Sequence, residues 1–470
     1  MENVVPPSSS ANNGDVPVVV APGRLPAFWD QRAIFVANLL GLFFGNEEET
    51  RMLADEVGEV ESYGGRMIPI LDLLYGGSGS NLLVLEREPD ASLCRYFEEV
   101  AGLSLPDRVI LPHRDYVAMG EALANGVEAE HEIIEALASH GAPWLDGYVT
   151  DETLAALAGQ VGKTTVSSFE GSHGGNNKRE LHRFLESAGL PVVTTELAAD
   201  KGEVAAALER LAKAGFSAGV IKAAIGASGI GLIKVPSLAD CRAIVEDLPE
   251  HFFFEGACLV QGWLQPGEMG VTAIRSPSVQ VFLDEKSVVL YDLTEQILSQ
   301  SSVHEGNEAP PPYLPNRPAL EPELMRQAGE AGRWLHRQGY RGTGSVDFLV
   351  VDYENGSTEV FVCEINARVT GATYPSVLAR RFMPEGAWLL RNLRFDQPLT
   401  GEALLAMLRR SGDLFVPGES EVGVLPVNFN FGPDGLIHKG QFLCLAHSPA
   451  GSHVLLELAE LDLPCQPDRD

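Results

Sequence analysis

Cysteine motifs and basic residues are both scarce in this sequence. Its six cysteines, at positions 94, 241, 258, 363, 444 and 465, form no Cys-x-x-Cys pair, so we expect reduced, buried thiols and no zinc site. Only 34 Lys and Arg stand against 65 Asp and Glu, which gives a formal net charge of −31. Nucleic acids and anionic membranes reward clustered basic residues, so neither is expected as a partner.

Long hydrophobic runs are also missing. The longest, Ala33–Phe44, is interrupted by Asn38 and falls short of the roughly 18 apolar residues of a membrane span. The N-terminus has no basic stretch followed by an apolar one, so we expect no secretory signal and a cytoplasmic location. Hydrophobic residues still make up 45% of the 470 residues, enough for folded cores in about three domains.

The alternation of strand-like and helix-like segments predicts an α/β protein. Residues 1–26 are rich in Pro, Ser and Asn and are expected to form a loose, disordered tail. Strand-like Ile34–Leu40 and Leu82–Leu85 are followed by helix-like segments, as in an α/β layer. A new unit begins near Lys178, where Asn176 or Asn177 can cap a helix.

A glycine-rich loop is predicted between two strand-like segments, 219–223 and 231–235. Glycines let backbone N–H groups approach phosphate oxygens closely, and Lys222 precedes the loop and can reach the same oxygens. The alternative is an ordinary flexible hairpin tip, and this segment alone does not separate the two. The loop contains Gly226, Ser228 and Gly229.

The segment 345–366 is predicted to be a β-hairpin that opposes two carboxylates. Asn355-Gly356 is a strong turn signal between apolar strands. With these two residues as the turn, Asp347 faces Glu364, with Cβ atoms about 5 Å apart. Asn366 lies two residues beyond Glu364 and shares its face of the sheet.

Two buried, opposed carboxylates need a compensating cation or a raised pKa. A hard divalent ion held by carboxylate and amide oxygens fits, and Mg²⁺ shared with nucleotide phosphates is the usual case. Alternatively, each carboxylate pairs with a separate arginine, or the register slips. Arg368 lies just past the strand, where it either stabilises transferring phosphoryl charge or forms a salt bridge to one of these carboxylates.

The segment 259–268 reads as an apolar strand followed by a turn. Backbone groups of an extended segment can match the edge of an adenine base, and a carboxylate such as Glu268 can accept ribose hydroxyls. In isolation this pattern is weak. Arg275 follows in the next strand, where a lone arginine is more often structural than catalytic.

Taken in order, these features resemble the ATP-grasp superfamily of carboxylate–amine ligases over about residues 165–395. The string Glu-Ile-Asn-Ala-Arg at 364–368 is a specific match. The resemblance implies an ATP-grasp fold of the α/β (α+β) class, with ATP and Mg²⁺ as cofactors. An α/β domain ahead of the ATP-grasp region and a C-terminal domain after it look like the arrangement in pheganomycin-type peptide ligases of bacterial secondary metabolism. This resemblance implies a role in antibiotic biosynthesis.

The resemblance also implies roles for individual residues. Lys178, Lys222 and the loop residues Gly226, Ser228, Gly229 and Gly231 would contact phosphates, and Arg368, Lys222 and Arg275 would be catalytic. Gln261, Gly262, Trp263, Leu264 and Glu268 would hold the nucleoside, and Asp347, Glu364 and Asn366 would bind magnesium. The sequence departs from the family at Gln261, usually acidic, and at Ser345, an arginine in some members.

The implied activity is ATP-dependent peptide bond formation through an acyl phosphate, with release of ADP and phosphate. The substrates would be an amino-acid-like carboxylate and an amine or peptide acceptor, and a homodimer is a common state in the superfamily. The alternatives are a nucleotide-binding regulator with a degenerate site and an ATP-grasp ligase of purine or carboxylase type. The implied domains are a tail (1–26), an N-terminal α/β domain (27–165), an ATP-grasp domain (166–395, lid about 192–260) and a C-terminal domain (396–470).

Overall fold

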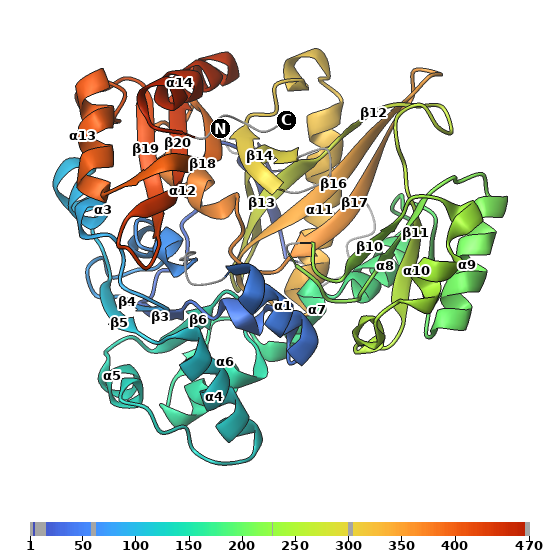
Figure 1. Ribbon diagram of the computed structural model, residues 1–470, viewed down its shortest axis with the longest axis horizontal. Coiled ribbons are helices and arrows are strands. Elements are labelled where there is room, and N and C mark those ends of the chain that lie inside the picture. The colour runs from blue at the N-terminus through green and yellow to red at the C-terminus, as the bar shows by residue number, and fades with distance from the viewer. Residues whose placement is uncertain (1–2, 5–15, 58–62, 228, 299–303, 466–470) are drawn as a thin grey trace.

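The computed structural model describes residues 3–4, 16–57, 63–227, 229–298 and 304–465, and the strands in these ranges form three sheets. A small sheet lies to one side of a large central sheet, and the sheet of the N-terminal region lies beneath (Figure 1). The predicted α/β class is confirmed. Across these ranges, every helix is too short or too polar to cross a membrane.

The N-terminal sheet is parallel, in the order β5-β4-β3-β6-β7. All of β3 is buried, as expected for a parallel strand covered on both faces. The predicted strand Ile34–Leu40 ends at Val36, because Asn38 bonds to the backbone of Val149 and the chain continues as a 3₁₀ turn. The elements are β3 (Ala33–Val36), α1 (Glu47–Val57), α2 (Leu71–Leu74), β4 (Leu82–Leu85), α3 (Ala91–Arg95), β5 (Asp107–Ile110), α4 (His113–Ala124), α5 (Ile133–Ser139), β6 (Trp144–Gly147), α6 (Glu152–Gln160) and β7 (Thr164–Thr165).

The small sheet is antiparallel, in the order β10-β9-β11-β8, and carries the glycine-rich loop between β9 and β10. One face packs against helix α9, whose apolar residues recur at helical spacing. Asn177 caps α8 by accepting from two backbone N–H groups, as the sequence predicted. The elements are α8 (Lys178–Ser187), β8 (Thr195–Ala198), α9 (Lys201–Lys213), β9 (Gly219–Lys222), β10 (Leu232–Val235), α10 (Arg242–Glu246) and β11 (Cys258–Gly262).

The large sheet runs β12-β16-β13-β14-β15-β18-β20-β19, with β17 paired to β16. The long helix α11 packs its apolar face on the centre of this sheet, beside Val288 and Phe348. The remaining elements are α7 (Phe169–Asn176), β12 (Val271–Arg275), β13 (Pro277–Leu283), β14 (Val288–Leu298), β15 (His304–Ala309), α11 (Leu320–Arg337), β16 (Gly342–Tyr353), β17 (Thr358–Asn366), α12 (Thr373–Phe382), β18 (Ala387–Leu399), α13 (Gly401–Ser411), β19 (Gly423–Phe431), β20 (Ile437–Ala446) and α14 (Pro449–Asp462).

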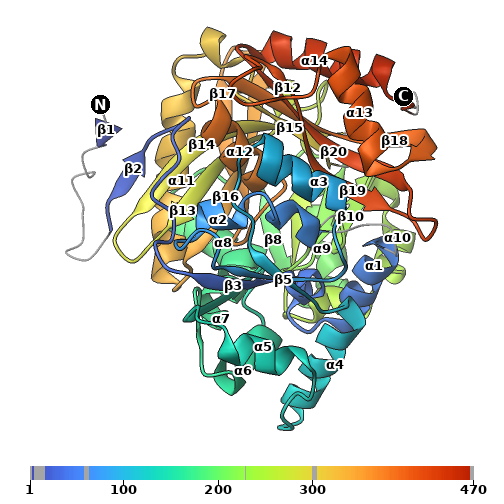
Figure 2. The same ribbon diagram turned by 90° about the vertical axis from the view of Figure 1, so that its left-hand side faces the viewer.

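The C-terminal region continues the large sheet. The boundary predicted at residue 396 falls inside β18, and both β19 and β20 extend from that strand. Figure 2 shows β19 beside α3 of the N-terminal region, and the hydroxyl of Tyr96 donates to the backbone oxygen of Phe415 (2.7 Å). The two regions also share one core, to which Phe97 and Phe442 belong. Helix α13 begins at Gly401, shortly after the predicted boundary, and the division into domains stays a prediction.

The N-terminal tail needs one correction. Residues Val18–Val20 form β2, which pairs in parallel with β14 and places Val18 in the core under α11. The prediction of a loose tail is therefore wrong for this segment, because three consecutive valines match an apolar groove that composition alone does not reveal. Residues 5–15 lie outside the described ranges.

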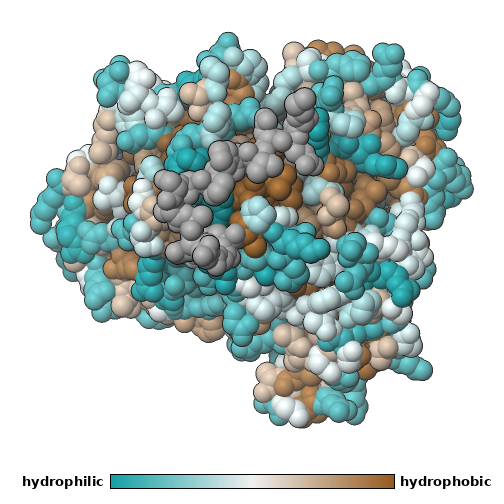
Figure 3. All heavy atoms as spheres, turned by 180° about the vertical axis from the view of Figure 1, so that it is seen from behind, coloured by the Kyte–Doolittle hydropathy of each residue, from teal (hydrophilic) through white to brown (hydrophobic). Residues whose placement is uncertain are grey.

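Hydrophilic side chains cover much of the face turned away in Figure 1 (Figure 3). The salt bridges on the described surface are mostly exposed pairs such as Arg242 with Glu246 (2.7 Å). Exposed pairs of this kind contribute little to stability. We therefore interpret most of the excess acidic residues as part of a solvated surface.

A buried ion pair ties α12 to the large sheet and gives a stability prediction. The Arg380 guanidinium contacts both oxygens of Asp292 (2.8 and 3.3 Å), and both residues are buried. Asp292→Ala should lower the free energy of unfolding by about 3–5 kcal/mol, because it strands a buried guanidinium. Urea denaturation measures this. Glu285→Ala, which removes an exposed partner of Arg341, should cost less than about 1 kcal/mol, and equal losses would contradict the prediction.

Candidate active site

The hairpin β16–β17 places Asp347 directly opposite Glu364, as predicted. Asp347 accepts hydrogen bonds from the hydroxyls of Ser278 (2.6 Å) and Ser345 (3.0 Å) and from the Asn366 amide (2.9 Å). The two carboxylates and the amide therefore lie on one face of the large sheet. Ser278 was not identified from the sequence, since only the pairing of β13 with β16 brings it beside Asp347.

The turn and the strand pairing that bring Asp347 opposite Glu364 differ from the predicted ones. The turn is one residue longer than a two-residue turn, because Tyr353, and not Glu354, pairs with Ser357. A bulge at Cys363 adds one residue to β17, so that the register returns to the predicted pair. The bulge also leaves Cys363 outside the ladder, next to Glu364.

The carboxylates differ in their electrostatic surroundings. Burial, followed by repulsion from Glu364, raises the pKa of Asp347 to about 6. Burial also acts to raise the pKa of Glu364, but attraction to Lys178 and Arg368 outweighs it, so the pKa of Glu364 is lowered. Glu364 is thus held ionised while Asp347 is kept close to protonation.

Lys178 reaches this pair from the first residue of α8. Its ammonium lies 2.8 Å from a Glu364 oxygen and donates to the backbone oxygen of Gly226 (3.1 Å) in the glycine-rich loop. Gly229 and Gly231 have positive φ values of 83° and 77°, which a side chain would strain. A Cβ on Gly226 would lie 2.6 Å from the Ile230 oxygen, so the loop is tight there. Ser228 lies outside the described residues.

Arg368 also acts on both carboxylates electrostatically. Its guanidinium donates to the Asn176 side chain, which also accepts from the Ala367 backbone N–H (3.2 Å). Burial lowers the pKa of Arg368, while Glu364 and Asp347 oppose that shift. Asn176, at the end of α7, was predicted only as a possible helix cap. Its contact with Arg368 depends on a tertiary approach that the sequence does not display.

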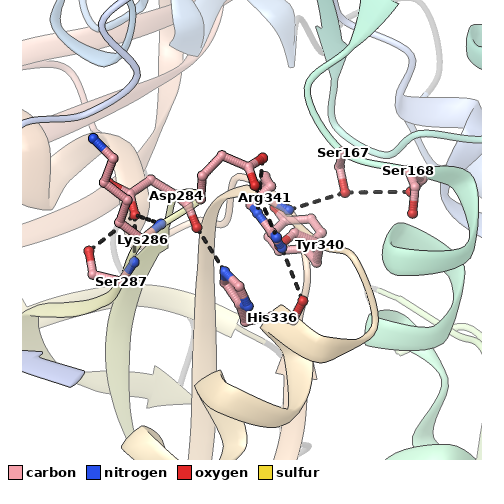
Figure 4. A network of polar contacts seen from close by, with 9 residues as sticks. Ser167, Ser168, Asp284, Lys286, Ser287, His336, Tyr340 and Arg341 are labelled. Carbon is pink, nitrogen blue, oxygen red and sulfur yellow. Dashed lines mark hydrogen bonds and ion pairs between the residues drawn. The ribbon is translucent and has the colours of Figure 1, made fainter. Parts of the chain in front are cut away.

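A polar network joins the end of α11 to the segment that precedes α7. Figure 4 shows Arg341 contacting Ser167, which precedes α7, and the end of α11; its backbone N–H donates to the Ser167 hydroxyl (3.3 Å). Arg341 also donates to the backbone oxygens of His336 (3.0 Å) and Tyr340 (2.7 Å). Tyr340 is buried beside Arg368 and Asp146. The network therefore ties the N-terminal region to the site.

The predicted nucleoside residues line one edge of the small sheet. Lys222 and Gln261 share a pocket with Lys178, Val362 and Cys363. The buried Gly262 packs on the Phe216 ring, where a Cβ would lie 2.3 Å from the nearest ring atom. The backbone N–H of Trp263 donates to the backbone oxygen of Ala218 (3.1 Å), and Leu264 packs against the core of the small sheet. Glu268 accepts from Ser217 and from Gln265 (2.7 Å).

Arg275 lies in a different cluster from the carboxylate pair. It pairs with Asp352, which also binds Arg317 (2.6 Å), and its guanidinium lies over the Tyr313 ring (5.0 Å). Arg317 hydrogen bonds, with help from Arg275, hold the pKa of Asp352 well below its usual range. These contacts give Arg275 a structural role and support no catalytic one.

Glu49 is a site neighbour that the sequence did not reveal. This α1 carboxylate is 1% exposed, and among the described residues its Oε1 has no hydrogen-bond partner, with His251 Nε2 lying 3.9 Å away. A Cβ on Gly231 would lie 2.9 Å from that oxygen, so Glu49 packs directly on the glycine-rich loop. Burial raises the pKa of Glu49 to about 7. Nothing in the periodicity of α1 distinguishes Glu49 from the neighbouring Glu47 and Glu48.

The residues present fit a hard divalent cation shared with phosphates. They provide two carboxylates and one amide oxygen, the donors that Mg²⁺ prefers. Among the described residues, no group of three His, Cys, Asp or Glu side chains could hold a metal alone. An ion here would therefore need further oxygens, and nucleotide phosphates would supply them.

The raised pKa of Asp347 predicts a stability cost at neutral pH. Because its folded-state pKa of about 6 exceeds the ordinary value of 3.8, ionisation destabilises the fold as pH rises through this window. At pH 7.5, Asp347→Asn should therefore raise the free energy of unfolding by on the order of 1 kcal/mol, a gain that disappears near pH 4. Urea titrations at both pH values measure it.

Asp352→Asn is the matched control. The pKa of Asp352 is lowered by its arginines, so its charge stabilises the fold at pH 7.5 and neutralisation should destabilise it. A loss of stability in both variants at pH 7.5 would contradict the assignment of Asp347.

No protein-family model matches the chain. The butirosin acyl-carrier protein–L-glutamate ligase of Niallia circulans is 30% identical over 199 residues, which are 42% of this chain and 44% of that protein. The match thus spans less than half of the curated relative.

Solved structures cover nearly the whole chain. An N5-carboxyaminoimidazole ribonucleotide synthetase in complex with ADP matches with a TM-score of 0.52 and 14% identity, covering 92% of this chain and 96% of that one. The biotin carboxylase domain of the Hydrogenobacter thermophilus 2-oxoglutarate carboxylase, a dimer with MgADP, ADP and bicarbonate, gives 0.54 and 13%, covering 93% and 91%. The chain therefore has the ATP-grasp fold that its motifs predicted.

Proposed function

We propose that the chain is an ATP-dependent ligase that joins a carboxylate to an amine or peptide through an acyl phosphate. The observation that carries the proposal is the arrangement of Asp347, Glu364 and Asn366 on one face, with Lys178 and Arg368 close to the carboxylates. A protein that only bound nucleotide would not need two opposed carboxylates with a lysine and an arginine beside them. This arrangement argues against the degenerate regulator.

The first step would transfer the γ-phosphoryl group. A substrate carboxylate oxygen attacks the γ-phosphorus, the bond from that phosphorus to the β–γ bridging oxygen breaks, and ADP leaves. Magnesium, when bound, would supply positive charge to the phosphate oxygens at Asp347, Glu364 and Asn366. Lys178 and Lys222 would neutralise the transferring group, so positioning and electrostatics do most of the catalysis.

The second step would form the amide. The amine nitrogen attacks the acyl carbon, the carbon–oxygen bond to phosphate breaks, and the amine loses a proton. Arg368 is placed to stabilise the negative charge that develops, because its guanidinium lies near both carboxylates and is fixed by Asn176.

Water must be kept from the acyl phosphate between the two steps. The glycine-rich loop already contacts Lys178 through Gly226 and Glu49 through Gly231. We propose that this loop covers the phosphates while the intermediate exists. Ser228, Gly229 and Gly231 would contribute to this cover, as the family resemblance implies.

The acceptor has a second candidate. The curated relative's name describes ligation of L-glutamate to an acyl-carrier protein. A carrier protein, in place of a free amine or peptide, is therefore the alternative acceptor, and the butirosin relationship supports a role in antibiotic biosynthesis. An amino-acid-like carboxylate fits both candidates. A homodimer, as in the biotin carboxylase neighbour, and a cytoplasmic location remain predictions.

Product analysis tests the proposed reaction. The purified protein with Mg²⁺ and ATP should release ADP and phosphate only when an acid and an acceptor are both present. Pairs of amino acids, short peptides and a carrier protein form the screen. AMP and pyrophosphate would contradict the acyl phosphate, and ADP release without any acid-dependence would favour a regulator or simple ATPase.

Glu364→Ala tests the metal assignment. It should lower turnover by at least about 10³-fold, since it removes a carboxylate that organises the phosphates. Glu359→Ala is the matched control, because Glu359 lies exposed on the same strand and should leave turnover unchanged. Circular dichroism checks the fold of both, and retained turnover in Glu364→Ala would contradict the assignment.

A further inference from the structure

Three side chains on one face of the small sheet form a directed hydrogen-bond chain. Lys222 donates to Gln261 Oε1 (2.8 Å), Gln261 Nε2 donates to Thr195 Oγ1 (2.8 Å), and Thr195 donates to the Val193 oxygen (2.8 Å). Thr195 and Gln261 are directly opposed in the β8–β11 ladder. Lys222 on β9 lies diagonally opposite Gln261 on β11, so all three side chains share one face of the small sheet.

The direction of each bond is fixed by chemistry. A protonated lysine only donates, so the group facing Lys222 must be the amide oxygen of Gln261. The Thr195 hydroxyl has one hydrogen, and that hydrogen is given to Val193. Thr195 must therefore accept, and the group facing it must be the amide nitrogen. Because Lys222 is also assigned to the nucleotide phosphates, Thr195 is the contact that would hold the Gln261 amide once Lys222 turns to a bound nucleotide.

We infer that the oxygen end of this amide, beside Lys222, faces the pocket proposed to take the nucleotide. Gln261 and Lys222 line the pocket, and Thr195 is not among its lining residues. An oxygen with a second lone pair can accept from the amino group of a 6-amino purine. A 6-oxo purine would bring its own carbonyl oxygen against this second lone pair, where two acceptors face each other with no hydrogen between them.

We propose that Thr195 is a positioning residue that fixes the Gln261 amide and thereby makes the site select 6-amino over 6-oxo purine nucleotides. This inference rests on the proposed function, since it assumes that the pocket takes a purine nucleotide. It gives Gln261 the acceptor role of the family's acidic residue. A glutamine free to rotate would present either end and would discriminate poorly between the two bases.

Calorimetric titration of the intact protein with MgADP and MgGDP tests this without any ligase substrate. The wild type should prefer ADP, and Thr195→Val should shrink the ratio of the two affinities by roughly tenfold, because the amide is released. Thr195→Ser keeps the hydroxyl and should keep the ratio. An unchanged ratio in Thr195→Val, or an equal fall in Thr195→Ser, would overturn the proposal.

The same substitution made in a Gln261→Glu protein separates positioning of the amide by Thr195 from simple packing. Gln261→Glu offers oxygens at both ends, so adding Thr195→Val to it should leave the ADP to GDP ratio unchanged. The same tenfold loss in that background would overturn the proposal. Failure of the wild type to bind either nucleotide would instead overturn the proposed function, together with everything that rests on it.

Discussion

Repulsion between Asp347 and Glu364 is the constraint around which the site is organised. A β-hairpin holds the two carboxylates in register, and neither can move away without breaking the ladder. The protein offsets the repulsion with Lys178 and Arg368 and with hydrogen bonds to Asp347. These groups also suit a phosphoryl transfer site. The structure thus accepts a local cost in stability that a bound cation and nucleotide would relieve.

Each of these compensating groups comes from a different part of the fold. Lys178 starts α8, Lys222 ends β9 in the small sheet, and Arg368 follows β17 and is held by Asn176 of α7. The net charge of −31 does not prevent anion binding, because the few cations that matter converge here. The acidic excess elsewhere belongs mainly to the solvated surface.

Local patterns predicted which residues belong to the site better than they predicted which residues contact one another. The pairing of Asp347 with Glu364 was predicted correctly, although a longer turn and a bulge at Cys363 together produce it. The extra residue in the turn and the extra residue in the bulge cancel each other, so neither alters the periodicity of the sequence. Arg275 pairs with Asp352, a partner that sequence spacing does not distinguish from Asp347. Glu49, Ser278 and β2 depend on long-range approach, which no local pattern encodes.

The most direct test of the central claim needs no ligase substrate. Crystals grown with ADP and Mn²⁺ would locate the ion by anomalous scattering. The account predicts an ion between the carboxylates of Asp347 and Glu364, sharing oxygens of the ADP phosphates, with Asn366 beside it. An ADP complex in which the ion lies elsewhere, while Lys178 stays paired with Glu364, would contradict it.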